Sequence, residues 1–271
     1  MKKVRLDQLV LSKGFVQSRE QAKALIMSGM VLVDGDRADK AGDMVKENCD
    51  IKLKSTLKYV SRGGLKLEKV VSRLKLDLNE CVCLDIGAST GGFTDCMLQN
   101  GAEKVYSVDV GYGQLAWKLR QDDRVISLER TNARYLTTQQ IPDKIDFASV
   151  DVSFISLTLI LPVLYNLLKD NAMAVVLVKP QFEAGRDQVG KKGVVRDAKI
   201  HEAVLYKIYD FCMEIGFSVI YMDYSPIKGP EGNIEYLFTI KKGNFESCDR
   251  NLIVDLVESS HYSLNEKKKQ M

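Results

Sequence analysis

The sequence predicts an α/β fold, with a seven-stranded, mostly parallel sheet between helices on both faces, preceded by a small α+β domain. Two observations lead to this prediction. From Val82 onward, apolar segments of strand length alternate with segments of helical periodicity, a pattern typical of parallel sheets joined by helical crossovers. Before that point, two short helical patterns and a few β-branched segments with a hairpin signal indicate a separate small domain.

The N-terminal pattern contains two helices and a small sheet. Val4–Lys13 has helical spacing, and the capping box Ser18–Gln21 opens a second helix. Met30–Val33 is an expected strand that runs into an Asp-Gly turn at Asp34, and Asp50–Leu53 is the expected returning strand. The predicted boundaries are 1–57 for this domain, 58–61 for a linker, 62–243 for the α/β domain and 244–271 for a peripheral extension.

The α/β domain begins with a helix that Ser61 is positioned to cap. The expected strands are Val82–Ile86, Lys104–Val110, Val125–Glu129, Phe147–Val152, Ala172–Val178, Ser218–Tyr224 and Ile234–Lys241. The expected intervening and final helices are Thr94–Asn100, Gln114–Arg120, Leu157–Leu168, His201–Ile215 and Asn251–Val257. The segment between the last two strands is too short for a helical crossover, so these strands should pair antiparallel. That hairpin is typical of the methyltransferase variant of the doubly wound, Rossmann-like fold.

Composition excludes several classes of protein. The chain has 271 residues, of which 45% are hydrophobic and 28% charged, as in ordinary globular proteins. No apolar segment approaches the roughly 20 residues that a membrane helix needs, and the first residues lack the apolar core of a signal peptide. We therefore expect a cytoplasmic protein with no membrane partner.

The cysteines and histidines predict no metal site. Six cysteines are scattered without a Cys-x-x-Cys pair, and His201 and His261 are the two histidines of the sequence. This set offers no plausible group of zinc ligands. We expect reduced, mostly buried thiols and no metal ion.

Charge is concentrated at the N-terminal end. Residues 1–75 hold 17 Lys and Arg against 9 Asp and Glu, whereas the whole chain has a net charge of only +3. A basic N-terminal region on a near-neutral body favours a polyanionic partner, with a solvated lysine-rich surface as the alternative.

A glycine-rich turn follows the strand that begins at Val82. Gly87, Gly91 and Gly92 allow a tight turn and close approach of a ligand. Their spacing differs from the dinucleotide fingerprint, so a ligand without phosphates, such as S-adenosylmethionine, suits it better. Asp85 lies at the end of this strand, and Asp109 ends the next one, where its carboxylate can accept hydrogen bonds from ribose hydroxyls. The alternative is an ordinary turn between a strand and a helix.

Charged residues occur at the ends of three other strands. Asp151 and Lys179 close two strands, and Glu235 lies in or beside the last one. Ligands bind outside the carboxyl ends of strands in open α/β sheets, so these side chains should converge. A lysine and two carboxylates, with Lys66 as a second cation, suit methylation of a ribose 2′-hydroxyl, a poor nucleophile that must lose its proton. Individually, they could instead cap a helix, make a structural ion pair or face solvent.

The longer motifs resemble a known family. The blocks that carry the resemblance are Tyr59–Leu67, Leu84–Thr94, Asp109–Trp117, Leu128–Arg134, Asp151–Ser156, Val178–Glu183 and Gly229–Tyr236. Together they are similar to the TlyA (hemolysin A) family of ribosomal RNA methyltransferases, over nearly the whole chain up to about Lys242. The N-terminal segments Arg5–Val10, Ser18–Ala22 and Gly29–Gly35 resemble the small RNA-binding module of one small-subunit ribosomal protein and of many pseudouridine synthases.

The resemblance implies transfer of a methyl group from S-adenosylmethionine to the 2′-hydroxyl of cytidine in ribosomal RNA, on ribosomal subunits. It implies a catalytic tetrad of Lys66, Asp151, Lys179 and Glu235. The cofactor site that we expect comprises Asp85, Gly87, Ser89, Gly91, Gly92, Phe93, Asp109, Asn132 and Phe154. The expected RNA contacts are Lys13, Arg19, Lys23, Arg62, Lys191 and Lys192, the last two in a glycine-rich loop that would close over RNA or else is a plain surface loop. The alternatives are a haemolysin, as the older family name implies, and methylation of an RNA base.

Overall fold

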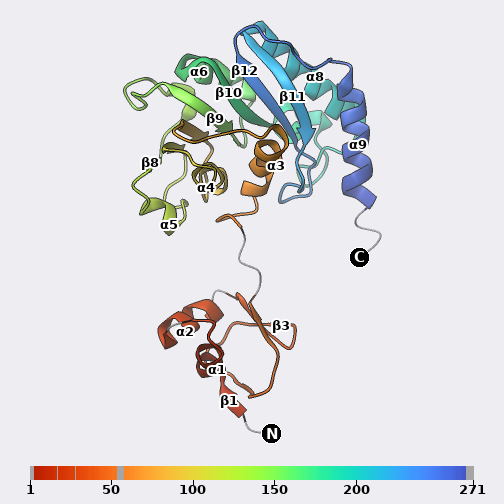
Figure 1. Ribbon diagram of the computed structural model, residues 1–271. Helices are drawn as coiled ribbons and strands as arrows, with labels where there is room; N and C mark the ends of the chain where they lie inside the picture. Colours follow the sequence, from red (N-terminus) through yellow and green to blue (C-terminus); the bar gives the residue numbers. More distant parts are fainter. Residues whose placement is uncertain (1–2, 17, 28, 54–57, 267–271) are drawn as a thin grey trace. The chain divides into compact units, whose positions relative to one another are not determined.

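The computed structural model describes residues 3–16, 18–27, 29–53 and 58–266 of the chain (Figure 1). Its contacts divide the protein into two compact units, residues 1–58 and 59–271. We describe each unit by itself.

The described residues of the first unit form two helices and two small antiparallel sheets. Its elements are β1 (Lys3–Arg5), α1 (Leu6–Ser12), α2 (Arg19–Met27), β2 (Val31–Val33), β3 (Asp36–Ala38), β4 (Met44–Lys46) and β5 (Ile51–Leu53). Two helices and a returning strand were expected, and β5 does pair with β2. The strand that follows the Asp-Gly turn is β3, however, and the expected helical start at Val4 is wrong because β1 pairs with β4 there.

A buried carboxylate joins the two helices of this unit. Asp7 on α1 is inaccessible to solvent and accepts hydrogen bonds from the guanidinium groups of Arg5 and Arg19, at 3.0–3.1 Å. The hydrogen bond from Arg5 is the largest influence, and together these contacts lower the pKa of Asp7 from its usual 3.8 to about 2. Arg19, expected to contact RNA, is therefore engaged at its Nε atom in an internal ion pair.

This pKa shift predicts how the first unit responds to acid. Asp7 binds a proton less readily in the folded state than in the unfolded state. The stability that its ionised carboxylate adds to the fold is therefore fully present above pH 3.8 and is lost as pH falls toward 2. Hydrogen exchange of the α1 and α2 amides in the full chain should accelerate across this window. In Asp7→Asn, that pH-dependent acceleration should be absent, and an unchanged acid profile in this variant would contradict the assignment.

The second unit contains a seven-stranded sheet in the order β11-β12-β10-β9-β6-β7-β8. Its strands are β6 (Val82–Ile86), β7 (Lys104–Val108), β8 (Val125–Leu128), β9 (Ile145–Val150), β10 (Leu168–Val178), β11 (Phe217–Tyr224) and β12 (Tyr236–Lys242). β12 pairs antiparallel with both of its neighbours, whereas β8, β7, β6, β9 and β10 pair parallel. The predicted parallel sheet with an antiparallel C-terminal hairpin is confirmed.

Helices pack against both faces of this sheet (Figure 1). The helical elements in the described part of this unit are α3 (Gly64–Leu74), α4 (Gly92–Gln99), α5 (Trp117–Arg120), η1 (Ala133–Tyr135), η2 (Leu157–Leu159), α6 (Leu161–Leu167), α7 (Pro180–Glu183), η3 (Arg186–Gln188), α8 (Ala198–Glu214) and α9 (Leu252–Glu266). Alternate residues of the central strands face opposite ways, so that Leu84 packs in one buried cluster and Cys83 in the other. The sheet is thus buried on both faces, as expected for parallel strands.

Two local expectations in the second unit differ from the structure. The helix expected over Leu157–Leu168 is shorter, because Leu168 already pairs with Ile145 as the first residue of β10. The C-terminal extension is not peripheral, since Ile253 and Val257 of α9 are fully buried and join the same core as the sheet. The helical periodicity was visible in the sequence, but the surface that buries it comes from α8 and β11.

None of the helices in the described part of the chain is both long enough and apolar enough to cross a membrane.

Candidate active site

The glycine-rich turn links the end of β6 to the start of α4. Gly87 has a φ of +85°, and a Cβ there would lie 2.4 Å from the backbone oxygen of Asp151. Gly91 has a φ of +92°, and a Cβ there would meet the Leu119 side chain at 2.3 Å. Glycine is therefore needed at both positions, at Gly87 because the turn passes directly against the end of β9.

Asp85, in β6 just before this turn, links the strand to the helix that follows the turn. Its carboxylate is fully buried and accepts hydrogen bonds from the backbone and hydroxyl of Thr94, at 2.9 and 2.7 Å, and from the Ser149 hydroxyl at 2.9 Å. Burial raises the pKa of Asp85 to about 6, in spite of the opposing effect of these hydrogen bonds. The expectation that Asp85 lines the cofactor site is not met, because its side chain lies on the face of the sheet covered by α4 and ties β6 to α4 and β9.

A cavity of about 320 Å³ opens beside the turn, at the carboxyl ends of β6, β7 and β9. Of the nine residues expected to bind a cofactor, five line it: Gly87, Ser89, Asp109, Asn132 and Phe154. Asp85, Gly91, Gly92 and Phe93 do not. A Cβ at Gly92 would lie 2.4 Å from the Ser61 hydroxyl, and Phe93 is buried in the core, so both serve packing.

Polar groups are fixed along one side of this cavity. The Asp109 carboxylate accepts backbone hydrogen bonds from Ser89 and Gly111, at 2.8 and 2.7 Å. A carboxylate has about four acceptor positions, so Asp109 can still accept hydrogen bonds from ligand hydroxyls. Val108, Val110, Ile155 and Ile160 provide apolar lining elsewhere in the cavity. A nucleoside with a flat apolar face and a diol at one edge fits this distribution.

The four residues predicted to form the tetrad lie in contact. Lys179 Nζ is 2.5 Å from Asp151 Oδ1, and Lys66 Nζ is 3.6 Å from Asp151 Oδ2. Lys66 Nζ also donates to Glu235 Oε2 at 2.6 Å. The charges alternate in sign along one continuous chain of ion pairs. Asp151 belongs to the lining of the cavity beside Gly87, so this series of ion pairs reaches that cavity.

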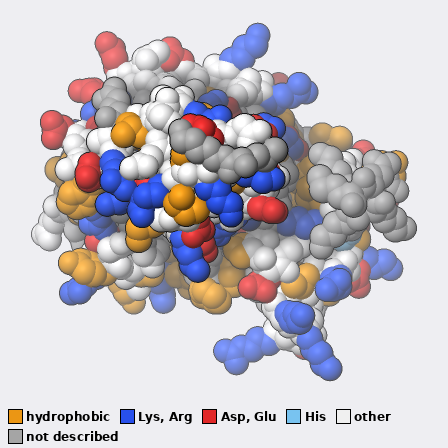
Figure 2. Space-filling view, turned by 90° about the horizontal axis from the view of Figure 1, so that it is seen from below, with side chains coloured by type: hydrophobic (Ala, Val, Ile, Leu, Met, Phe, Trp, Pro, Cys, Tyr) orange, Lys and Arg blue, Asp and Glu red, His pale blue; other side chains and the backbone are white. Residues whose placement is uncertain are grey.

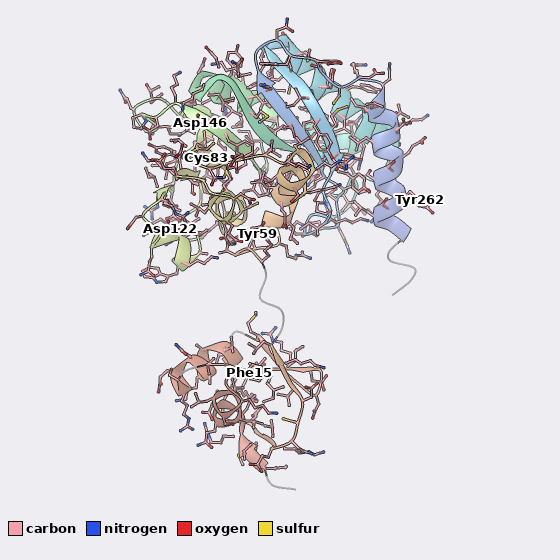
Figure 3. The ribbon with its side chains drawn as sticks, viewed as in Figure 1. Phe15, Tyr59, Cys83, Asp122, Asp146 and Tyr262 are labelled. Carbon is pink, nitrogen blue, oxygen red and sulfur yellow. The ribbon has the colours of Figure 1, made fainter. Side chains whose placement is uncertain are left out.

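One helix and three strands bring these side chains together. Lys66 projects from α3, and Figure 3 shows Tyr59 near that helix. The first residue of α3 packs closely on Tyr59, because a Cβ at Gly64 would lie 2.4 Å from that ring. Asp151 and Lys179 directly follow β9 and β10, and Glu235 directly precedes β12. Because β12 is reversed, its beginning lies at the same edge as the ends of the parallel strands. The antiparallel hairpin therefore delivers Glu235 to the site.

Burial makes these charges interact strongly. The side chains of Lys66 and Lys179 are only 9% and 10% exposed, and that of Glu235 is 2% exposed. Burial alone would lower the pKa of Lys66, but Asp151 and Glu235 more than offset this effect, so the pKa of Lys66 is raised. Lys66 is therefore held as a cation that fixes the two carboxylates.

A second cavity, of about 400 Å³, adjoins the first. Ser153 and Phe154 line both cavities, and Lys179 and Glu235 line this one. The rings of Phe154 and Phe182 approach to 4.8 Å between centroids, and Phe154 is 90% exposed. The site thus has two compartments that meet beside the lysine of the tetrad.

The residues that sequence reasoning missed lie next to those it found. Ser153 accepts a hydrogen bond from Lys179 Nζ at 3.1 Å, and the Ser89 hydroxyl donates to Gln114 at 3.2 Å. Gln114 and Thr131 also line the first cavity, and Phe182 lines the second. Ser153 and Phe182 occur within the motif blocks Asp151–Ser156 and Val178–Glu183, which was a usable signal.

The residues expected to bind RNA are distributed over both units. Those exposed to solvent are Lys13, Lys23, Arg62, Lys191 and Lys192, and Lys192 also lines the second cavity. Figure 2 shows lysine and arginine side chains spread among hydrophobic ones over the face that it displays. No cluster of potential metal ligands occurs among residues 3–16, 18–27, 29–53 and 58–266.

Comparison with known proteins agrees with this arrangement. Residues 59–242 match the FtsJ-like methyltransferase family, and residues 4–51 match the S4 domain. The chain is 48% identical to the provisionally named rRNA methyltransferase YqxC of Bacillus subtilis, over 98% of this chain and 97% of that protein. It is 41% identical to the 16S/23S rRNA (cytidine-2′-O)-methyltransferase TlyA of Mycobacterium tuberculosis, over 89% of this chain and 90% of that protein.

A solved structure shows the same likeness. The chain matches a protein of Streptococcus thermophilus that carries the provisional name hemolysin, with a TM-score of 0.77, 48% identity and coverage of 99% of both chains. Fold and site together thus define a methyltransferase of the FtsJ-like class joined to an S4 module. Within that class, the chain belongs to the TlyA (hemolysin A) family of rRNA methyltransferases.

Proposed function

We propose that this protein transfers the methyl group of S-adenosylmethionine to the 2′-hydroxyl of a cytidine in ribosomal RNA. The chain of ion pairs from Lys179 through Asp151 and Lys66 to Glu235 is the observation that supports this proposal most strongly. The amine of Lys179 lines the second cavity, and the Asp151 carboxylate that it contacts lines the first. This is the arrangement that a proton-accepting group between a methyl donor and a ribose requires.

The first cavity suits S-adenosylmethionine. Asp109 would accept hydrogen bonds from the ribose hydroxyls, and the apolar side chains of Val110 and Ile155 would cover the adenine. The absence of a Cβ at Gly87 leaves the backbone free to approach the methionine end. When bound, this molecule supplies an electrophilic methyl group on a sulfonium sulfur.

The tetrad residues divide the remaining work. Lys179, as a neutral amine, would hold the 2′-hydroxyl and take up its proton to become an ammonium group as the new carbon–oxygen bond forms and the carbon–sulfur bond breaks. Asp151 directs the Lys179 amine, and Lys66 holds Asp151 in place while its own charge is balanced by Glu235. Most of the acceleration would come from aligning oxygen, carbon and sulfur at about 3 Å.

The S4 module supports ribosomal RNA as the substrate and the ribosome as the partner. Lys13 and Lys23 would contact phosphates, whereas Arg19 would act mainly through its ion pair with Asp7. Such a substrate places the protein in the cytoplasm, with ribosomal subunits.

Lys191 and Lys192 provide a test of RNA contact by the second unit. Both are exposed in the loop that precedes α8. Replacing both by alanine should weaken RNA binding by about 10-fold at moderate salt and reduce the slope of log affinity against log salt by about 1.5, because two phosphate contacts are lost. Lys144→Ala/Lys199→Ala removes two exposed lysines that line neither cavity and is the matched control. Equal slopes in the two double variants would exclude the loop from RNA binding.

The activity is tested by locating the transferred methyl. Purified protein is incubated with methyl-labelled S-adenosylmethionine and ribosomal subunits from cells that lack the protein, and the RNA is digested to nucleosides. The label should appear in 2′-O-methylcytidine. Label in a base-methylated nucleoside would support the alternative activity on a base, and absence of label from RNA would contradict both.

A further inference from the structure

Asp151 and Lys179 lie just beyond the pairing between β9 and β10, whose last paired residues are Val150 and Val176. Asp151 begins loop 151–156, and Lys179 begins segment 179–183, which contains α7. The backbone at Asp151 is held by Ile86 of β6, and Lys179 follows Val178, which pairs with β12, so contacts between the two segments add to the hold of the sheet on the 2.5 Å contact between Lys179 and Asp151. This question arises only within the proposed methyl transfer, on which the present inference rests.

Glu183 makes the most extensive of these contacts. Its side chain is only 2% exposed, and both oxygens are used: Oε1 accepts from the Leu157 backbone at 2.7 Å, and Oε2 accepts from the Ser156 hydroxyl at 2.7 Å. Lys207 on α8 donates to Oε2 and to the Glu183 backbone oxygen, each at 3.2 Å. A buried carboxylate is costly unless it is fully paired, and this one is paired across both loops.

Loop 151–156 also contains a strained residue that needs support from both sides. Phe154 has a φ of +63°, in the left-handed region that a phenylalanine rarely adopts. On one side, Ser153 is held by Lys179 at 3.1 Å, and on the other side Ser156 is held by Glu183. Such a conformation persists only when its surroundings determine it, and Glu183 supplies the anchor at the far end of the loop.

Glu183 lines neither cavity, so it would act through other residues. We propose that Glu183 is a positioning residue that fixes loop 151–156 against segment 179–183 and thereby sets the distance and direction between Asp151 and Lys179. Removing the carboxylate releases the Leu157 backbone and the Ser156 hydroxyl together, which allows the loop to move relative to Lys179. Misplacement of a catalytic group by about 1 Å can reduce turnover by about 100-fold.

The test compares variants around this carboxylate in the full chain, with S-adenosylmethionine and ribosomal subunits as substrates. Glu183→Ala should lower kcat by about 100-fold while the KM for subunits and the Kd for S-adenosylmethionine change by less than about threefold. Glu183→Gln keeps an acceptor for the Leu157 backbone and should recover most of kcat. Lys207→Met leaves the bonds to Ser156 and Leu157 intact and should retain kcat within about twofold.

Ser156→Ala removes one bond of the clamp with little risk to folding and should lower kcat by about fivefold, again without a change in cofactor Kd. Unchanged kcat in both Glu183→Ala and Ser156→Ala would overturn the proposal. So would a loss in Glu183→Ala that follows cofactor affinity or the folded fraction, because a general structural role predicts that correlation. If the wild-type protein failed to methylate ribose, the proposed function itself would fail, and this comparison would reveal that before any variant was measured.

Discussion

Replacing Lys179 by methionine should lower the rate of methyl transfer by about 10³-fold, within the range of effects for loss of a positioned proton acceptor. Methionine has nearly the length of lysine but carries no amine, so the second cavity, which Lys179 lines, keeps most of its shape. Asp151 retains Lys66 as a partner at 3.6 Å, which limits the damage to the rest of the chain of ion pairs. The Kd for S-adenosylmethionine should therefore stay within about threefold of wild type. Single-turnover rates and calorimetric titration give the two quantities separately.

The matched control for this variant is Lys69→Met. Lys69 lies on the same helix as Lys66 and is also tied by an ion pair, to Asp223 at 2.7 Å, but it lines neither of the two cavities. Its replacement should lower the stability of the fold but leave the rate of methyl transfer by the folded protein unchanged. Wild-type turnover in Lys179→Met would remove Lys179 from the mechanism.

The second large effect is expected for Gly87→Ala. The added methyl group would lie 2.4 Å from the Asp151 backbone oxygen, and the φ of +85° is unfavourable for alanine. Both problems are relieved only if the turn moves away from the end of β9, which displaces the surface that would hold the methionine end of the cofactor. We expect the Kd for S-adenosylmethionine to rise by about 100-fold, with a loss of stability of about 1–3 kcal/mol. Calorimetric titration and denaturant unfolding measure these changes.

Gly232→Ala separates backbone strain from the steric clash. Gly232 has a φ of +95°, close to that of Gly87, but a Cβ there would meet no atom within 4 Å. This control should show a similar strain cost and an unchanged Kd for S-adenosylmethionine. If both variants bound the cofactor as the wild type does, the turn at Gly87 would not form the cofactor site.

Much of the second unit could be predicted from sequence because its strands are short apolar segments that alternate clearly with segments of helical periodicity. The same topology predicts that three of the four charged residues converge, since Asp151 and Lys179 directly follow parallel strands and Glu235 directly precedes the reversed one. The structure brings all four charged residues together, although Lys66 and Glu235 are 169 positions apart. The positions of these charged side chains are thus determined by the sheet edge at which their strands end or begin, more than by local propensity.

Other features depend on tertiary contacts that no local pattern encodes. Periodicity favours a helix that starts at Val4, but Val4 belongs to β1, which pairs with β4. Both strands are only three residues long, which is too short to show a strand pattern in the sequence. Asp85 occupies a motif position typical of a binding residue. In β6, however, its side chain lies on the face of the sheet covered by α4, where it bonds Thr94 and Ser149. Glu183 likewise appears in a motif as one more acidic residue, and only its hydrogen bonds across the loops indicate a role.

The central claim is that the lysine of the tetrad lies beside the methyl donor, with room for one ribose oxygen between them. A crystal structure with S-adenosylhomocysteine measures this directly. We predict that the ribose of that molecule contacts Asp109 and that its sulfur faces Lys179 at the wall shared by the two cavities. A sulfur atom directed away from Lys179, or a nucleoside bound outside the cavity beside Gly87, would contradict the account.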